Sequence, residues 1–145
     1  IKKYVDDEDF MLTYGDGVSD IDLDELLRFH QNHGKLITMT SVQPDGRFGT
    51  FNSDKSGSVT EFLEKPRGDG SWINGGFFVC EPEVLNYITQ GDATVFEQQP
   101  LQNLAEDGEM LTYRHNGFWK CMDTLRDKTE LNNMWKSGKA PWKIW

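Results

Sequence analysis

The chain has 145 residues, a formal net charge of −9 and a pI of about 4.7. This acidic balance argues against a nucleic-acid partner, because phosphate backbones are bound by clustered Lys and Arg. No apolar run approaches the roughly 20 residues of a membrane span, and residues 1–7 lack the apolar stretch of a signal peptide. We therefore expect one folded domain over residues 1–145, with neither a nucleic acid nor a membrane as partner.

The first half of the chain has the pattern of a strand, a helix and a second strand. The apolar run 10–14 predicts a buried strand that ends in a Gly-Asp-Gly turn. Two candidate N-caps, Asp20 and Asp22, precede a helical pattern that ends at Gly34. Residues 36–42 are rich in β-branched side chains and predict the next strand. Such a unit favours parallel pairing of its two strands.

The second half of the chain mixes strands and short helices. Two strands are expected around a polar turn, and a third is interrupted by Gly75 and Gly76, which suggests a bulge or the close approach of a ligand. Trp142 and Trp145 in the tail are expected to pack on the body of the domain. The elements expected here are strands 47–52, 58–64, 72–80, 110–115 and 118–122, and helices 82–88, 95–106 with its first turn near Pro100, and 124–136.

The cysteines and histidines do not form a recognisable site pattern. Cys80 and Cys121 are far apart and belong to no CxxC motif, which favours free thiols in a reducing cytoplasm over a disulfide. The histidines His30, His33 and His115 are scattered, with no third ligand nearby in sequence, so they do not predict a zinc site.

Five short motifs occur in a fixed order along the chain: Tyr14-Gly15-Asp16-Gly17, Gly46-Arg47-Phe48-Gly49, Glu64-Lys65-Pro66, Asn74-Gly75-Gly76-Phe77-Phe78 and Met122-Asp123-Thr124-Leu125-Arg126-Asp127. Together with Phe96-Glu97-Gln98 and the tail Lys139-Ala140-Pro141-Trp142-Lys143, the series resembles the sugar-phosphate nucleotidyltransferases over the whole chain. It is most similar to their glucose-1-phosphate cytidylyltransferase branch. The glycine-rich loop with which this family holds the nucleotide phosphates has no counterpart in the sequence.

The resemblance implies an α/β fold with a truncated Rossmann-like sheet. This sheet is expected to be mixed and mainly parallel, with a small antiparallel β subregion and a C-terminal helix. Strand 10–14 would then have one bare edge, and an exposed apolar edge favours pairing with another chain. We therefore expect a homo-oligomer that covers this edge.

Asp16 and Asp123 are the candidate metal ligands. By residue type alone, Asp16 is more readily explained as a turn residue, and Asp123 can be an N-cap, a role that Thr124 could also fill. The resemblance implies that both carboxylates bind Mg²⁺, which typically takes one or two protein carboxylates and completes its shell with water and phosphate.

The remaining candidate residues would bind the sugar phosphate. The resemblance implies that Lys65 contacts the phosphate and acts with Asp16 and Asp123 in catalysis, although a surface ion pair with Glu64 is the simpler interpretation of its neighbourhood. Arg47 contacts a phosphate or lies on the surface. The residues implied in binding the sugar phosphate are Glu64, Asn74, Gly75, Gly49 and Arg47.

The family reaction converts CTP and glucose 1-phosphate into CDP-glucose and pyrophosphate, a step that points to polysaccharide biosynthesis. Without the nucleotide-binding loop, this chain alone is expected to be inactive. Two other functions remain open: a sugar-phosphate binding module without turnover, and a structural or interaction protein.

Overall fold

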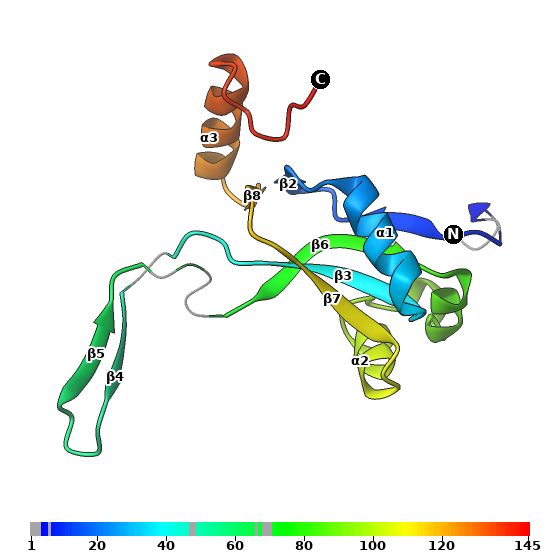
Figure 1. Cartoon of the computed structure of the whole chain (residues 1–145), viewed down its shortest axis with the longest axis horizontal. Helices are drawn as coiled ribbons and strands as arrows, with labels where there is room; N and C mark the ends of the chain where they lie inside the picture. The colour runs from blue at the N-terminus through cyan, green and yellow to red at the C-terminus, as the bar shows by residue number, and fades with distance from the viewer. Residues whose placement is uncertain (1–3, 6, 47–48, 66, 68–70) are drawn as a thin grey trace.

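The elements of the chain are seen in a computed structural model that describes residues 4–5, 7–46, 49–65, 67 and 71–145 (Figure 1). In chain order they are β1 (Phe10–Thr13), β2 (Gly17–Ser19), α1 (Leu23–His33), β3 (Ile37–Val42), β4 (Thr50–Ser53), β5 (Val59–Leu63), β6 (Ile73–Cys80), the 3₁₀ helices η3 (Pro82–Tyr87) and η4 (Gly91–Ala93), α2 (Gln99–Glu106), β7 (Met110–His115), β8 (Trp119–Cys121) and α3 (Leu125–Lys136). Within these residues, no helix combines the length and apolar character needed to cross a membrane.

The main sheet has four strands in the order β1-β6-β3-β7. β6 is antiparallel to both of its neighbours, whereas β3 and β7 are parallel. Strands β1, β3 and β7 thus run in one direction and β6 in the other, so the expected mixed α/β sheet is confirmed.

The expected pairing of the first strand with the second is wrong, because β6 lies between β1 and β3. β6 spans eight residues and is buried over most of its length, a pattern typical of a strand covered on both faces. The central position therefore goes to β6, and β1 lies at an edge of the sheet.

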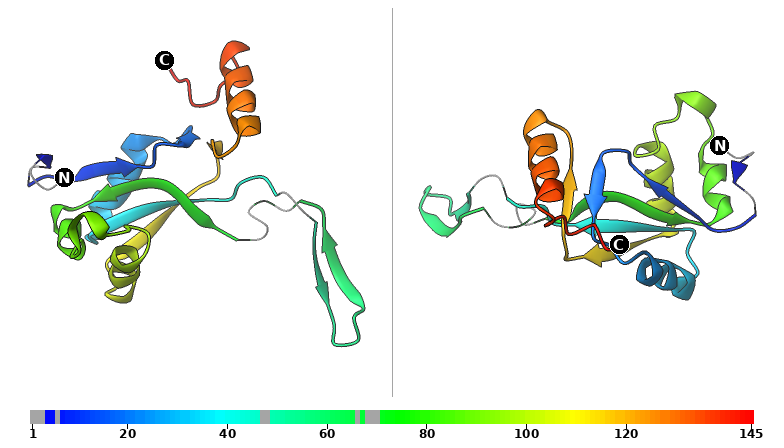
Figure 2. Two further views of the ribbon diagram at one scale, coloured as in Figure 1. Left: turned by 180° about the vertical axis from the view of Figure 1, so that it is seen from behind. Right: turned by 90° about the horizontal axis from the view of Figure 1, so that it is seen from above.

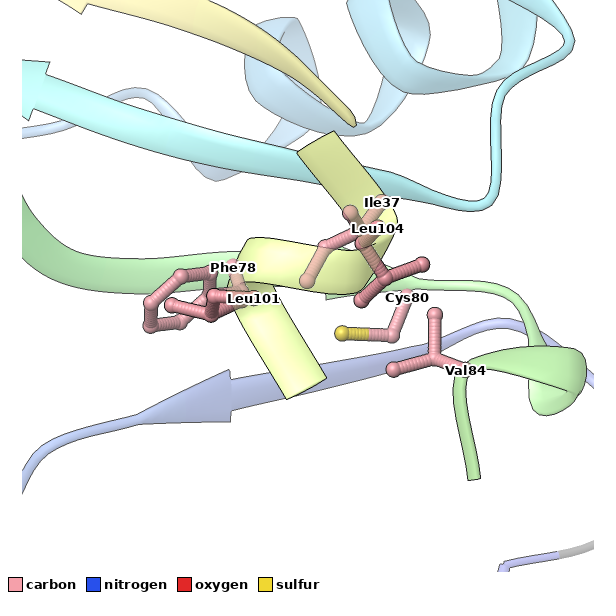
Figure 3. Close-up of a cluster of buried hydrophobic side chains, with 6 residues drawn as sticks. All are labelled: Ile37, Phe78, Cys80, Val84, Leu101 and Leu104. Carbon is pink, nitrogen blue, oxygen red and sulfur yellow. The ribbon is translucent and has the colours of Figure 1, made fainter. Parts of the chain in front are cut away.

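Helices cover both faces of this sheet (Figure 2). On one face, Leu26 of α1 packs with Ile21 and Val79. On the other face, α2 and η3 contribute to the main hydrophobic cluster, shown in Figure 3, which consists of Ile37, Phe78, Cys80, Val84, Leu101 and Leu104. The core is therefore a three-layer arrangement with β6 and β3 at its centre.

The capping residues of α1 explain where it begins and ends. The carboxylate of Asp22 accepts a hydrogen bond from the Glu25 amide at 2.9 Å, so Asp22 is the N-cap. Gly34 has a φ of 64° and ends the helix in the left-handed conformation. The other candidate cap, Asp20, instead accepts a hydrogen bond at 2.7 Å from the Phe118 amide, and so ties the start of α1 to the approach to β8.

Strands β4 and β5 form a hairpin that projects away from the main sheet (Figures 1 and 2). Its register pairs Phe51 with Phe62, and both rings are more than half exposed, at 62% and 61%. The described residues of the hairpin thus form strands without a layer to cover them.

A second small unit is formed by β2, β8, α3 and the tail. The three-residue strand β2 pairs antiparallel with β8 and was not expected from the sequence, because it is too short to show a periodicity. Trp142 stacks on Phe118 with ring centroids 5.3 Å apart, which confirms the expected packing. For Trp145 the expectation is wrong: it lies near Trp135 but stays 79% exposed, since no further layer covers the end of the chain.

Candidate functional site

The β2–β8 ribbon brings Asp16 and Asp123 to the same place. Gly17 pairs with Cys121 in the ribbon register, and the carbonyl of Asp16 accepts a hydrogen bond from the Met122 amide at 2.8 Å. Asp16 is therefore next to Met122, and Asp123 is the following residue. Two segments far apart in sequence thus place the backbones of Asp16 and Asp123 close together at the end of the same ribbon.

The N-cap interpretation of Asp123 does not hold, because Thr124 caps α3. The Thr124 hydroxyl accepts from the Asp127 amide, and the Asp127 carboxylate accepts from the Thr124 amide, which completes a capping box. The thiol of Cys121 donates a hydrogen bond to Oδ2 of Asp123 at 3.0 Å. The carboxylate of Asp123 is held by a thiol and takes no part in the cap.

The Cys121 thiol acts as a hydrogen-bond donor to this carboxylate and is poorly suited to act as a nucleophile. Burial raises the pKa of the Cys121 thiol to about 11, with further contributions from its hydrogen bond to Asp123 and from the charge of that group. The thiol is therefore protonated at neutral pH and available as a donor. Both cysteines are free, as the sequence favoured.

The two aspartates fit a magnesium ion by the chemistry of their donors. Both side chains are exposed, and both offer carboxylate oxygens, the ligands that Mg²⁺ prefers in proteins. An exposed pair also leaves room for water and phosphate oxygens in the remaining coordination positions. A second group of potential metal ligands, Asp9, His30 and Glu81, lies at the opposite end of β1. It includes neither Asp16 nor Asp123.

Tyr14 connects three of the motifs at the end of β1. Its hydroxyl accepts a hydrogen bond from the Asn74 amide group at 2.9 Å. Burial raises the pKa of Tyr14 to about 12, helped by its hydrogen bond to Glu97. Asn74 Oδ1 also accepts from the Gly76 amide at 2.8 Å, yet an amide side chain has capacity for further hydrogen bonds. Asn74 therefore orders the local backbone and can still contact a ligand.

The glycine pair in β6 forms a bulge that the surrounding side chains require. The β3–β6 register shifts at this point. Gly76 has a φ of +75°, and a Cβ there would lie 2.6 Å from the ring of Tyr14; one at Gly75 would lie 3.0 Å from Val42. The Gly75 carbonyl accepts from Trp119 Nε1 at 2.7 Å. Packing alone thus explains the absence of side chains at both positions.

Glu64 and Gly49 lie together beside the β4–β5 hairpin, which Figure 1 shows away from the β2–β8 ribbon. A Cβ on Gly49 would lie 2.7 Å from the ring of Phe62 and 3.0 Å from Glu64 Oε2. Lys65 has a φ of 47°, and its Nζ lies 3.8 Å from Glu64 Oε1, with both side chains more than 60% exposed. The surface ion pair is therefore present. Arg47 lies outside the described residues.

Lys120 is a cation in β8 that the motif series does not include. Its Nζ lies 2.6 Å from Glu130 Oε2 and 3.7 Å from Asp127 Oδ1, so it joins β8 to the start of α3. A lysine within a three-residue strand carries no local signal of such a role. Glu97 belongs to one of the segments that carry the family resemblance, and its contact with Tyr14 is tertiary and cannot be predicted from the sequence.

Comparisons with known proteins agree with the motif series. Residues 1–136 match the family described as Nucleotidyl transferase. The chain is 52% identical over its whole length to the glucose-1-phosphate cytidylyltransferase of Salmonella typhimurium. It is 45% identical, over 99% of its length, to the probable glucose-1-phosphate cytidylyltransferase of Bacillus subtilis. It spans only 56% of each of these relatives.

The fold has similar solved structures as well. A putative glucose-1-phosphate thymidylyltransferase from Bacillus anthracis superimposes with a TM-score of 0.65 at 16% identity, over 99% of this chain and 58% of that one. At this identity the likeness concerns the fold. The family match and the identities confirm the resemblance inferred from the motifs, and the chain belongs to the nucleotidyl transferase family.

Proposed function

We propose that this chain is the sugar-phosphate- and metal-binding part of a glucose-1-phosphate cytidylyltransferase. The complete enzyme would convert CTP and glucose 1-phosphate into CDP-glucose and pyrophosphate. The observation that supports this proposal best is the hydrogen bond between the Asp16 carbonyl and the Met122 amide, because it holds Asp16 beside Asp123. We treat residues 1–145 as one α/β unit that carries the hairpin as an extension.

In the proposed reaction, an oxygen of the sugar phosphate attacks the α-phosphorus of CTP and the P–O bond to pyrophosphate breaks. Asp16 and Asp123 would hold Mg²⁺, which would supply charge neutralisation on the phosphates when bound. Lys65 would position the sugar phosphate through its cationic head group. Most of the rate enhancement would then come from positioning and from stabilisation of negative charge.

Glucose is proposed to be bound by residues beside the hairpin and by residues of β6. Glu64 can accept hydrogen bonds from sugar hydroxyls, and Gly49 and Gly75 are proposed to contact such groups through their backbone. Asn74 has donor and acceptor capacity beyond its two internal contacts. Arg47 is proposed as a phosphate contact from the sequence alone. Because Lys65 and Glu64 belong to the exposed hairpin, binding would require the hairpin and the ribbon to meet around the ligand.

The chain is expected to bind without turnover when it is alone, since it spans 56% of its relatives and its sequence has no glycine-rich phosphate loop. A homo-oligomer that covers the bare edge of β1 and the exposed hairpin is part of the proposal, supported by the exposed rings of Phe51 and Phe62. The two free thiols support the proposal of a cytoplasmic location. For the pathway, we propose polysaccharide biosynthesis, because CDP-glucose would be the product of the complete enzyme.

The test is calorimetric titration of the chain with glucose 1-phosphate in Mg²⁺, together with a pyrophosphate-release assay that contains CTP. We expect saturable binding, at least tenfold weaker in Lys65→Met and in the double variant Asp16→Asn/Asp123→Asn, and no release of pyrophosphate. Lys55→Met, which removes a lysine in the hairpin turn, is the matched control. Binding that is equal in all variants would contradict the assigned residues, and sustained pyrophosphate release would contradict the expected inactivity.

A further inference from the structure

A second cluster of potential metal ligands lies at the opposite end of β1 from Asp16. Asp9 directly precedes β1 and Glu81 directly follows β6, and the antiparallel register that pairs Phe10 with Cys80 brings them together. His30, near the end of α1, completes the group. One ligand atom from each of Asp9, His30 and Glu81 lies within 4.8 Å of the others.

The imidazole of His30 gives this cluster its strongest feature. The residue is only 1% exposed, and among the described residues its Nε2 is a buried polar atom without a hydrogen-bond partner. Nε2 faces Glu81, whose Oε1 is 3.7 Å away. A buried polar atom normally has a partner, and leaving it without one is costly. The His30 ring therefore directs an unused nitrogen toward two carboxylates.

The other ring nitrogen of His30, Nδ1, already has a hydrogen-bond partner. Nδ1 lies 2.8 Å from Oγ1 of Thr38, and His33 Nε2 lies 2.6 Å from the same oxygen. The Lys35 amide donates to His33 Nδ1 at 2.9 Å, so a neutral His33 carries its proton on Nε2 and donates to Thr38. A hydroxyl oxygen has two lone pairs and can accept from both rings. In the tautomer in which Nδ1–H of His30 donates to Thr38, the lone pair of Nε2 is available to a ligand.

Electrostatics in the cluster favour a bound cation. Asp9 and Glu81 place two carboxylates beside the buried ring of His30. A divalent cation would neutralise both carboxylates and satisfy Nε2 in one step.

We propose that Asp9, His30 and Glu81 form a second metal site, for a first-row divalent ion of the Zn²⁺ type. One imidazole nitrogen and two carboxylate oxygens suit such an ion, whereas Mg²⁺ favours oxygen alone. In the tautomer with the proton on Nδ1, the hydrogen bond between His30 Nδ1 and the Thr38 hydroxyl fixes the orientation of the ring, as is usual for metal-bound histidines. Asp9 is exposed and the Glu81 side chain is 37% exposed, so an ion can reach the carboxylates of the cluster from solvent.

The ion would join three elements at the edge of the sheet. Asp9 directly precedes β1, His30 belongs to α1 and Glu81 directly follows β6, so one ion would link the edge strand to the helix that covers it. Asp9 is exposed and precedes the strand, so its carboxylate can approach the other two ligands with little rearrangement. This role is structural and independent of the reaction proposed above.

The proposal is tested by titration of the metal-free chain with Zn²⁺ against a chromophoric chelator at pH 7.5. We expect one tight equivalent in the wild type, and binding weakened at least about tenfold in Asp9→Asn and Glu81→Gln, since even loss of an outer-shell partner costs that much. Both substitutions keep the shape of the side chain, and circular dichroism of the metal-free variants verifies the fold. Equal affinity in these variants, or no tight equivalent in the wild type, would overturn the proposal.

Three matched variants separate this site from its neighbours. Glu83→Gln removes another exposed carboxylate beside Glu81, Cys121→Ser removes the partly exposed thiol, and Asp123→Asn removes the proposed magnesium ligand. All three should retain the tight equivalent. In spectra of ¹⁵N-histidine-labelled protein, Zn²⁺ should shift the ring signals of His30 and leave those of His115 unchanged. A shift confined to His115 would assign the ion elsewhere.

Discussion

The main sheet and the β4–β5 hairpin are built from similar residues but differ in what covers them. Phe78 in β6 is 1% exposed, whereas Phe62 in β5 is 61% exposed. The sheet has α1 on one face and α2 with η3 on the other, and the hairpin projects from this core without either layer (Figures 1 and 2). Apolar β-branched and aromatic residues thus predict a strand, but the neighbouring layers decide whether the strand contributes a core.

The largest effect that can test this comparison is loss of a buried ring. Phe78→Ala should lower the free energy of unfolding by about 3–5 kcal/mol, because it leaves a cavity between β6 and the helices. Phe62→Ala should change it by less than about 0.5 kcal/mol, as is usual for exposed positions. Urea unfolding monitored by tryptophan fluorescence measures both. Comparable losses would mean that the hairpin is covered as well as the sheet.

A smaller difference is expected between two glycines with positive φ. Gly76→Ala should destabilise the chain by about 2–3 kcal/mol, because it adds backbone strain and a contact with Tyr14. Gly57 in the hairpin turn has a φ of +89° and open space around it, so Gly57→Ala adds only strain and should cost about 1–2 kcal/mol. If the two variants unfold at the same urea concentration, the tight packing assigned to Gly76 is wrong.

A further effect is expected in the pH dependence of stability, through Tyr14 at the end of β1 in the main sheet. The pKa of Tyr14 is raised to about 12 in the folded chain from 10.0, so the unfolded chain loses this proton first. The resulting stabilisation is fully present below pH 10 and is lost as the pH rises toward 12. Tyr14→Phe should flatten this decline in denaturant unfolding experiments between pH 10 and 12. An identical decline in both proteins would show that Tyr14 is not protected by burial and Glu97.

Much of the fold could be predicted from local patterns. The cap at Asp22, the stop at Gly34 and the start of α2 near Pro100 follow from the chemistry of single residues. The pairing order could not be predicted, since β6 is placed between β1 and β3 by burial on both faces and not by its neighbours in sequence. The three-residue strand β2 is too short to show a pattern, and Trp145 could not be known to be exposed without its surroundings.

The candidate sites divide in the same way. Asp16 and Asp123 were found by resemblance, and the ribbon register explains how they meet. The contacts of Asn74 and Gly76 with Tyr14 are tertiary, so the sequence left a bulge and a ligand contact as equal alternatives. The scattered histidines predicted no zinc site, because the partners of His30 are supplied by strand ends in other parts of the chain. Spacing along the sequence can predict a site whose residues lie in one helix or strand. A site whose residues come from several elements can be predicted only when the pairing register of the strands is known.

The position of β6 between two strands that precede it in sequence also affects the order of folding. β1 cannot pair with its neighbour until the chain has continued to Cys80, and β3 meets β7 only after α2 has been made. Pairings between such distant segments form slowly, because the entropy of closing a long loop is lost before the contacts contribute any stability. The β4–β5 hairpin needs only a local turn and can form within about 1–10 μs. We therefore expect the exposed hairpin to be among the first ordered structures and the buried sheet to follow it.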